Sequence, residues 1–83
     1  KLKSDLRRKV EILKSYPNSR FVIHAEYSKN GVIPENKAVA SIKADSVQDQ
    51  LLSLGVPQYS IEKKLEAKEN GKTGRVNVQV LKR

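Results

Sequence analysis

The only histidine, His24, lies in the middle of an alternating segment, where it could act as a general base or a metal ligand. A general base needs an aligned partner, and Glu26 is the one nearby carboxylate expected on the same strand face. A metal ion needs several ligands at fixed spacing, but the chain has no cysteine and no acidic or His cluster beside His24. The positions of Asp5, Asp45 and Asp49 suggest no catalytic triad either. The sequence therefore predicts a protein that is not an enzyme and binds no metal or cofactor.

The segment from Gly71 to Gly74 reads Gly-Lys-Thr-Gly, which matches the Gly-x-x-Gly loop of K-homology nucleic-acid modules, where a Lys suits a phosphate. In those modules the loop joins two helices. Here it stands between two segments with strand patterns, so a hairpin turn is the preferred interpretation. Base stacking on a sheet needs paired aromatic residues, and the four aromatic residues are not arranged in that way: Tyr16, Phe21, Tyr27 and Tyr59. Nucleic acid stays an alternative that rests on net charge.

The chain is short and basic. Its 83 residues, 37% hydrophobic and 31% charged, suffice for one small domain. Seventeen Lys and Arg against nine Asp and Glu give a formal charge of +8, so the protein should attract anionic partners. The first fourteen positions hold six basic residues: Lys1, Lys3, Arg7, Arg8, Lys9 and Lys14. They suffice to contact an anionic membrane surface, but a solvated outer face of the helix is the preferred interpretation.

Hydrophobic spacing predicts two helices. Leu2, Leu6, Val10 and Leu13 recur at helical steps, and Pro17 ends this first helix. A second helix begins at Asn36 and carries apolar residues at steps of four and three, with Gly55 at its C-cap: Ala40, Ala44, Val47, Leu51 and Leu54. The polar stretch from Ser28 to Glu35 is expected to be a loop.

Alternation predicts three strands, over residues 20–27, 61–67 and 75–81. The first two, joined by a helix, should pair in parallel through a right-handed crossover, and the last two should form an antiparallel hairpin. We therefore expect an α+β fold, a small mixed three-stranded sheet with two helices on one face, in the order α-β-α-β-β. Residues 1–83 form a single domain in this interpretation, with an N-terminal linker helix over 1–16 and a βαββ core over 20–81.

Two motifs carry a family resemblance. The positions of a strand running into Gly-His-Thr-Asp-x-x-Gly are filled here by Ile23, Ala25, Glu26, Tyr27, Ser28 and Gly31. The spacing of Asn-x-x-Leu-Ser-x-x-Arg-Ala-x-x-Val is matched without a gap by Asn36, Val39, Ala40, Lys43, Ala44 and Val47. Arg75-Val76 is similar to an Arg-Val pair in the last strand. On these residues the stretch from Ser15 to Val80 resembles the OmpA-like peptidoglycan-binding domain, also found at the C-terminus of flagellar-motor stator proteins.

The resemblance implies a binding site at Ser28, Asn36 and Lys43. In that family an Asp and an Arg hold the charged ends of diaminopimelate in the peptidoglycan stem peptide, while the Asn at the start of the helix supports the site. Ser28 stands at the Asp position, so the negative charge of the family's carboxylate is lost. Lys43 stands at the Arg position, so a compact ammonium group replaces the planar guanidinium with its two parallel donors. Tyr27 would narrow the mouth of this site, and Arg75 joins the predicted ligand-binding residues.

The resemblance also implies a setting. It predicts a non-catalytic periplasmic domain that anchors to the cell wall, tethered by a membrane segment upstream, in a stator-like ion channel complex of a flagellar motor or a secretion system. A homodimer is expected in that setting. Two alternatives remain open: an OmpA-like fold kept as a dimerisation or protein-docking module without wall binding, and a small basic nucleic-acid-binding domain.

Overall fold

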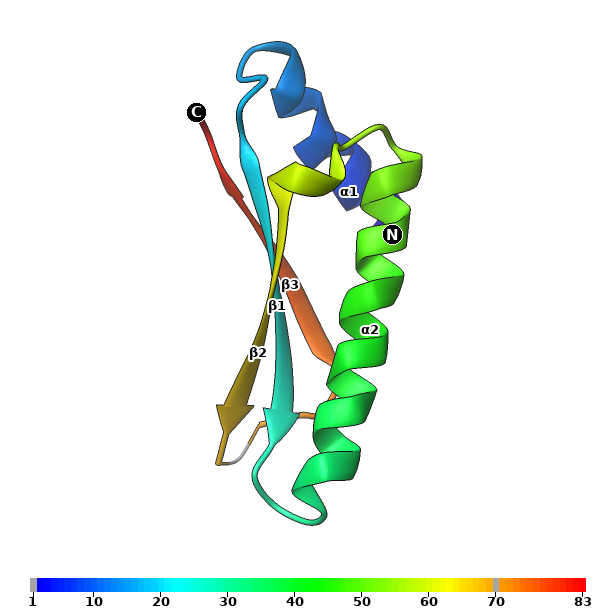
Figure 1. Cartoon of the computed structure of the whole chain (residues 1–83), viewed down its shortest axis with the longest axis vertical. Helices are drawn as coiled ribbons and strands as arrows, with labels where there is room; N and C mark the ends of the chain where they lie inside the picture. The colour runs from blue at the N-terminus through cyan, green and yellow to red at the C-terminus, as the bar shows by residue number, and fades with distance from the viewer. Residues whose placement is uncertain (1, 70) are drawn as a thin grey trace.

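The computed structural model describes residues 2–69 and 71–83 and has two layers, helices on one side and a sheet on the other (Figure 1). The fold is α+β in the order α-β-α-β-β, as the sequence predicts. Its elements are α1 (Leu2–Val10), the 3-10 turn η1 (Glu11–Lys14), β1 (Arg20–Ser28), α2 (Ile33–Ser53), the 3-10 turn η2 (Gln58–Ser60), β2 (Ile61–Lys68) and β3 (Arg75–Leu81). No helix of the described ranges combines the length and apolarity needed to cross a bilayer.

The sheet has the strand order β2-β1-β3, with β1 in the centre. β1 pairs in parallel with β2, with Phe21 opposite Ile61, and antiparallel with β3, with Ile23 opposite Val78. The predicted parallel unit is confirmed, but the predicted hairpin of the last two strands is wrong. β2 and β3 are the two edges of the sheet, so the segment after Lys68 crosses the end of β1 instead of turning back beside β2.

Hydrogen bonds at the end of β1 show how this crossing is held. The backbone N–H of Lys29 donates to the carbonyl oxygen of Lys68 at 3.0 Å, and that of Gly74 donates to Glu26 at 2.9 Å. The Gly-Lys-Thr-Gly loop is therefore a crossover between two edge strands. This finding corrects the hairpin-turn interpretation, and the loop does not join two helices as in a K-homology module.

The apolar stripe of α2 packs on the sheet as the spacing predicts. Ala40, Ala44, Val47 and Leu51 are buried, and Gly55 after the helix has φ of +96°, the left-handed conformation of a C-cap. The helix begins at Ile33, three residues before the predicted start. Pro34 stands in its first turn, where a missing N–H costs no helical hydrogen bond.

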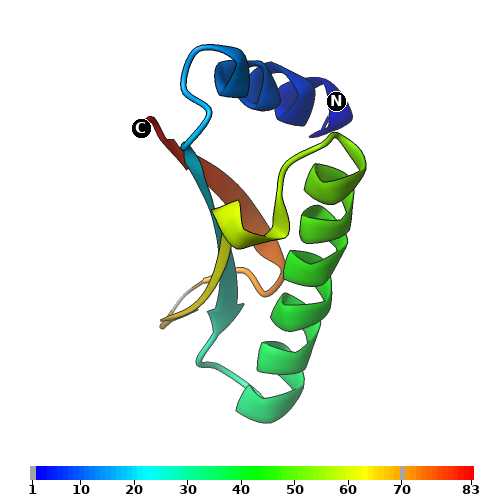
Figure 2. The same ribbon diagram turned by 45° about the horizontal axis from the view of Figure 1, so that its top comes forward.

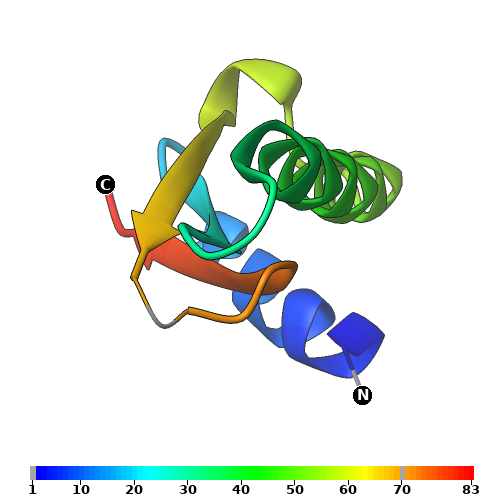
Figure 3. The ribbon, with the colours of Figure 1, turned by 90° about the horizontal axis from the view of Figure 1, so that it is seen from below.

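One hydrophobic cluster joins both helices to the sheet. Phe21, Ile23 and Ala25 of β1 are fully buried against α2. Leu6 of α1 is 1% exposed and belongs to the same cluster, so the segment predicted as a linker helix contributes to the core. Figures 2 and 3 show both helices on the same side of the sheet.

The opposite face of the sheet is uncovered (Figure 3). Its side chains alternate with those of the core, and the register brings together His24, Glu26, Lys64, Glu66, Arg75 and Asn77. The molecule is elongated, with extents of 43 × 21 × 20 Å. The end of β1 and the start of α2 lie at one end of the long axis, and α1 lies toward the other (Figure 1).

Candidate functional site

Ser28, the last residue of β1, is fixed by three hydrogen bonds. Its backbone N–H donates to Oγ1 of Thr73 at 3.0 Å, and its hydroxyl oxygen accepts the backbone N–H of Asn30 at 3.0 Å. Its carbonyl oxygen accepts the side-chain amide of Asn36 at 3.1 Å. The end of the strand is therefore tied both to the crossover loop and to the first turn of α2.

Asn36 ties the loop between β1 and α2. Its Nδ2 donates to the carbonyl oxygen of Ser28 and, at 2.8 Å, to that of Asn30. Gly31, which follows Asn30, has φ of +85°, a conformation that residues with a Cβ atom rarely adopt. The two bonds show that Asn36 holds the loop, and its support of a ligand site stays a prediction. Its amide donors are directed to the backbone and not to solvent.

Lys43 lies two helical turns further along α2 and reaches the crossover loop. A Cβ atom at Gly74 would lie 3.5 Å from its Cε and 3.7 Å from its Cγ, so the aliphatic part of the side chain covers Gly74. Lys43 is exposed and forms no ion pair with any side chain that the structure describes. Its ammonium group can therefore receive an anion from solvent.

Contacts link these residues into one region, which we call the strand-end site: Ser28, Asn36, Lys43 and Thr73. Ser28 contacts both Asn36 and Thr73, and Thr73 precedes the glycine that Lys43 covers. The backbone of Ser28 and the side chain of Asn36 thus meet at the end of β1, and Lys43 lies over Gly74 nearby, whereas the alternation of β1 directs the Ser28 hydroxyl to the uncovered face. The region offers one cation, two hydroxyls and several backbone groups, and no carboxylate is among its members.

Tyr27 and Arg75 lie on different faces of the sheet. Tyr27 is half-buried and packs against the core, on the side of the sheet that α2 covers. Arg75 is opposite Glu26 in register and therefore points to the uncovered face. The structure does not bring Arg75 into the strand-end site with Lys43, so a contact of both with one small ligand group is not supported.

The uncovered face carries a second polar constellation around His24. Nδ1 of His24 lies 3.3 Å from Oε2 of Glu66, and Nε2 lies 3.0 Å from Oε1 of Gln79. Glu26, the partner that the sequence suggests, instead accepts the backbone N–H of Lys72 at 2.8 Å. A shallow depression here is lined by His24, Glu26, Glu66, Lys68, Arg75 and Asn77.

No group of three potential metal ligands from His, Cys, Asp and Glu occurs within residues 2–69 and 71–83. The contacts of His24 with Glu66 and Gln79 come from both edge strands. Sequence reasoning missed them because the sheet order was not known, although the alternation of each strand does place all three residues on the same face. Thr73 was missed as a member of the strand-end site because it lies in a turn without periodicity.

Comparison with known proteins adds no identification, since no protein-family model matches the chain and a search of curated proteins found no match. The similarity to OmpA-like domains therefore rests on the spacing of the two motifs.

Proposed function

We propose that this chain is a non-catalytic binding domain that attaches to peptidoglycan stem peptides through the strand-end site. The observation that carries the proposal is the double hydrogen bond of Asn36 to Ser28 and Asn30. It joins the last residue of β1 to the start of α2, the two segments that carry the motifs, and Lys43 is exposed two helical turns further along α2. Stem peptides carry carboxylates, and an exposed ammonium group is a suitable contact for them.

The binding mode would differ from that of a complete OmpA-like site. Lys43 contacts a carboxylate as a point charge, without the two parallel hydrogen bonds of an Arg. Ser28 offers an ammonium group of the ligand only a hydroxyl oxygen, which already accepts the Asn30 N–H, and no negative charge. We therefore expect reversible attachment that depends on a carboxylate more than on a zwitterionic end. In the setting that the resemblance implies, the domain is periplasmic and belongs to a stator-like membrane protein.

Binding to purified peptidoglycan sacculi tests this function. We expect the parent protein to cosediment with sacculi, and Lys43→Ala to weaken retention about fivefold, which corresponds to about 1 kcal/mol for one exposed charged contact. Lys37→Ala is the matched control because it removes an exposed lysine from the same helix. Equal retention of both variants, or no retention of the parent, would contradict the proposal.

A second candidate function is docking of another protein without wall binding. Val39 and Ile42 of α2 are 42% and 68% exposed, although both are apolar. The Asn36 amide bonds to the backbone of its own loop and not to a ligand. This bonding and the exposed apolar side chains favour a domain that contacts another protein. Analytical ultracentrifugation tests one form of it, self-association, which Ile42→Glu would abolish; under this alternative neither the parent nor the variant is retained by sacculi.

A further inference from the structure

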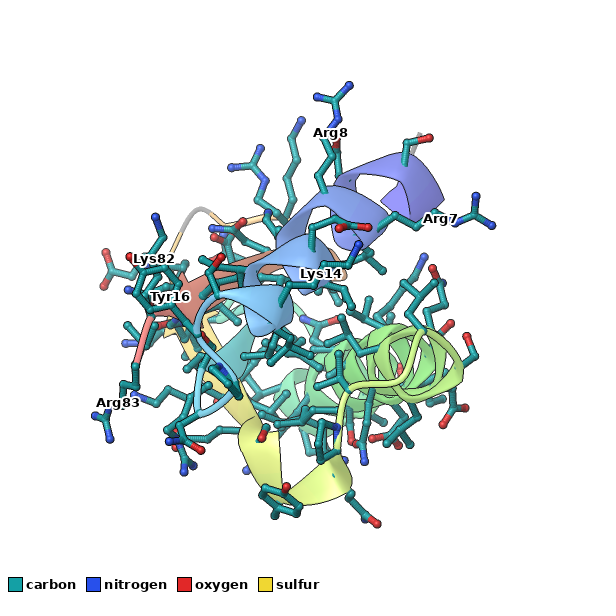
Figure 4. All side chains as sticks on the ribbon, turned by 90° about the horizontal axis from the view of Figure 1, so that it is seen from above. Arg7, Arg8, Lys14, Tyr16, Lys82 and Arg83 are labelled. Carbon is teal, nitrogen blue, oxygen red and sulfur yellow. The ribbon has the colours of Figure 1, made fainter. Side chains whose placement is uncertain are left out.

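Basic residues gather at the end of the molecule that is remote from the strand-end site. Segments 4–16 and 82–83, whose side chains the structure describes, contain six Lys and Arg residues but only two acidic residues. α1, η1 and the end of β3 come together there, although they are far apart in sequence. Figure 4 looks onto this end and shows Arg7, Arg8, Lys14, Lys82 and Arg83 around it.

Two of these segments are in contact. Nζ of Lys82 lies 5.8 Å from the centre of the Tyr16 ring, within the range of a cation–π interaction. The contact connects the turn after η1 to the segment after β3, so their charges belong to one surface. We call this surface the basic end and define it by Arg7, Arg8, Lys9, Lys14, Tyr16, Lys82 and Arg83.

Few of these charges are neutralised within the molecule. Lys14 forms an ion pair with Glu11 at 2.8 Å, and this hydrogen bond raises the pKa of Lys14 above its ordinary value. Arg8, Lys82 and Arg83 are exposed and form no ion pair with another described side chain. The dipole of α1 explains only part of this clustering of basic residues. Basic residues in the last turn of α1 are favourable there, but Lys82 and Arg83 lie outside any helix.

We propose that the basic end docks on the surface of an anionic lipid bilayer and contacts the phosphates of its headgroups. Clustered Lys and Arg residues bind such surfaces additively and in a salt-sensitive way. The charges come from separate segments that converge on one end of an elongated molecule, a geometry that suits end-on contact with a plane. The strand-end site would then be held away from the bilayer.

The shape of the charged surface favours lipid over nucleic acid. Tyr16 is the aromatic residue of the basic end and is already engaged by Lys82. Tyr59 in η2 is 83% exposed but is a single ring outside the basic end, so the surface offers no paired aromatic platform for base stacking. Along the uncovered face of β2, acidic and basic residues alternate: Glu62, Lys64, Glu66 and Lys68. The basic surface therefore does not continue as a track along the sheet that a nucleic-acid strand could follow.

Cosedimentation with vesicles tests the proposal without reference to peptidoglycan. We expect the 83-residue protein to bind vesicles in which roughly a third of the lipid is phosphatidylglycerol at least about tenfold more tightly than vesicles of phosphatidylcholine alone. Salt at about 0.5 M should abolish the difference. The double variant Arg8→Glu, Lys82→Glu reverses one charge in each of the two contacting segments and should bring binding to the level of neutral vesicles.

The matched control is Lys29→Glu, Lys37→Glu, which changes the net charge by the same amount with exposed residues at the other end of the molecule. It should keep most of the binding. Equal loss in the two double variants would show that net charge, and not the basic end, is responsible, and would overturn the proposal. So would binding that is equal on both vesicle types, or that DNA or RNA at equal phosphate concentration displaces completely. Far-UV circular dichroism verifies that both variants are folded.

Discussion

The side-chain amide of Asn36 donates to the carbonyl oxygen of Ser28 at 3.1 Å, which fastens the first turn of α2 to the last residue of β1. The same nitrogen donates to Asn30 at 2.8 Å. One side chain therefore closes the loop between the central strand and the long helix. The local geometry of the strand-end site depends on it, because Ser28 has no other bond to α2 among the hydrogen bonds of the described residues.

Replacing Asn36 should destabilise the fold through this loop. We expect Asn36→Ala to lower the free energy of unfolding by about 1 to 2 kcal/mol, because two hydrogen bonds of a half-buried group are lost. Urea denaturation measures the change. Lys37→Ala, at the exposed neighbouring position, should stay within about 0.5 kcal/mol of the parent. If both variants are equally stable, the amide does not hold the loop.

Gly74 lies under the Lys43 side chain, whereas Gly55 lies far from the strand-end site, at the C-terminal end of α2. Their φ angles are +90° and +96°, so alanine at either position should cost about 1 kcal/mol or more in unfolding free energy. Only at Gly74 would the new Cβ atom contact Lys43. We therefore expect similar thermal unfolding of Gly74→Ala and Gly55→Ala, but weaker retention by sacculi for Gly74→Ala alone. Equal retention of the two variants by sacculi would show that Lys43 is not part of the binding surface.

Leu6 tests whether α1 belongs to the folded domain. It is 1% exposed, so Leu6→Ala should lower the unfolding free energy by about 2 to 4 kcal/mol through lost burial and the cavity left behind. Leu52→Ala, at a residue 37% exposed, is the control and should cost less than about 1 kcal/mol. A change below 1 kcal/mol for Leu6→Ala would mean that the helix is dispensable for stability.

Hydrogen exchange reports the strand order directly. β1 is paired on both sides, so all its interior amides, such as those of Val22 and Ile23, should exchange slowly. In β2 and β3, every second amide points away from the sheet and should exchange fast. If β2 and β3 formed a hairpin instead, one of them would be central and β1 would show the alternating pattern of an edge strand.

The sequence predicted the helices well because their signals are local. The spacing of Ala40, Ala44, Val47 and Leu51 and the position of Gly55 follow from helix geometry alone, and the structure agrees at each. The start of α2 was placed too late because Pro34 and its polar neighbours were interpreted as a loop. Proline in the first turn of a helix looks the same in sequence as proline in a turn.

The predicted strand order was wrong because strand pairing depends on residues that are far apart in sequence. A short connection favours pairing of consecutive strands, and the sequence from Lys68 to Arg75 offered no sign that it crosses β1. In the structure, Phe21, Ile23 and Ala25 are fully buried. Even Val22, on the outer face of the sheet, is only 4% exposed to solvent. The strand with the most apolar side chains occupies the centre, where burial is greatest.

The candidate site was predictable in part. Motif spacing predicts a site at Ser28, Asn36 and Lys43; the structure joins Asn36 to the Ser28 backbone and lays Lys43 over Gly74, and a shared ligand stays a prediction. Arg75 was grouped with them from its position in the last strand. Its side chain points to the uncovered face, on the side of the sheet opposite α2 and Lys43, because the register of β3 against β1 sets its direction, and that register could not be obtained from a single strand.

The two edges of the sheet differ in how they meet another strand. β2 carries Lys63, Lys64 and Lys68, and lysines at an edge discourage strand-to-strand aggregation. β3 has no charged residue between Arg75 and Lys82 and alternates valines with amides. Concentrated solutions of the protein should therefore begin to aggregate at β3, and a lysine introduced by Gln79→Lys would raise solubility more than any further charge on β2.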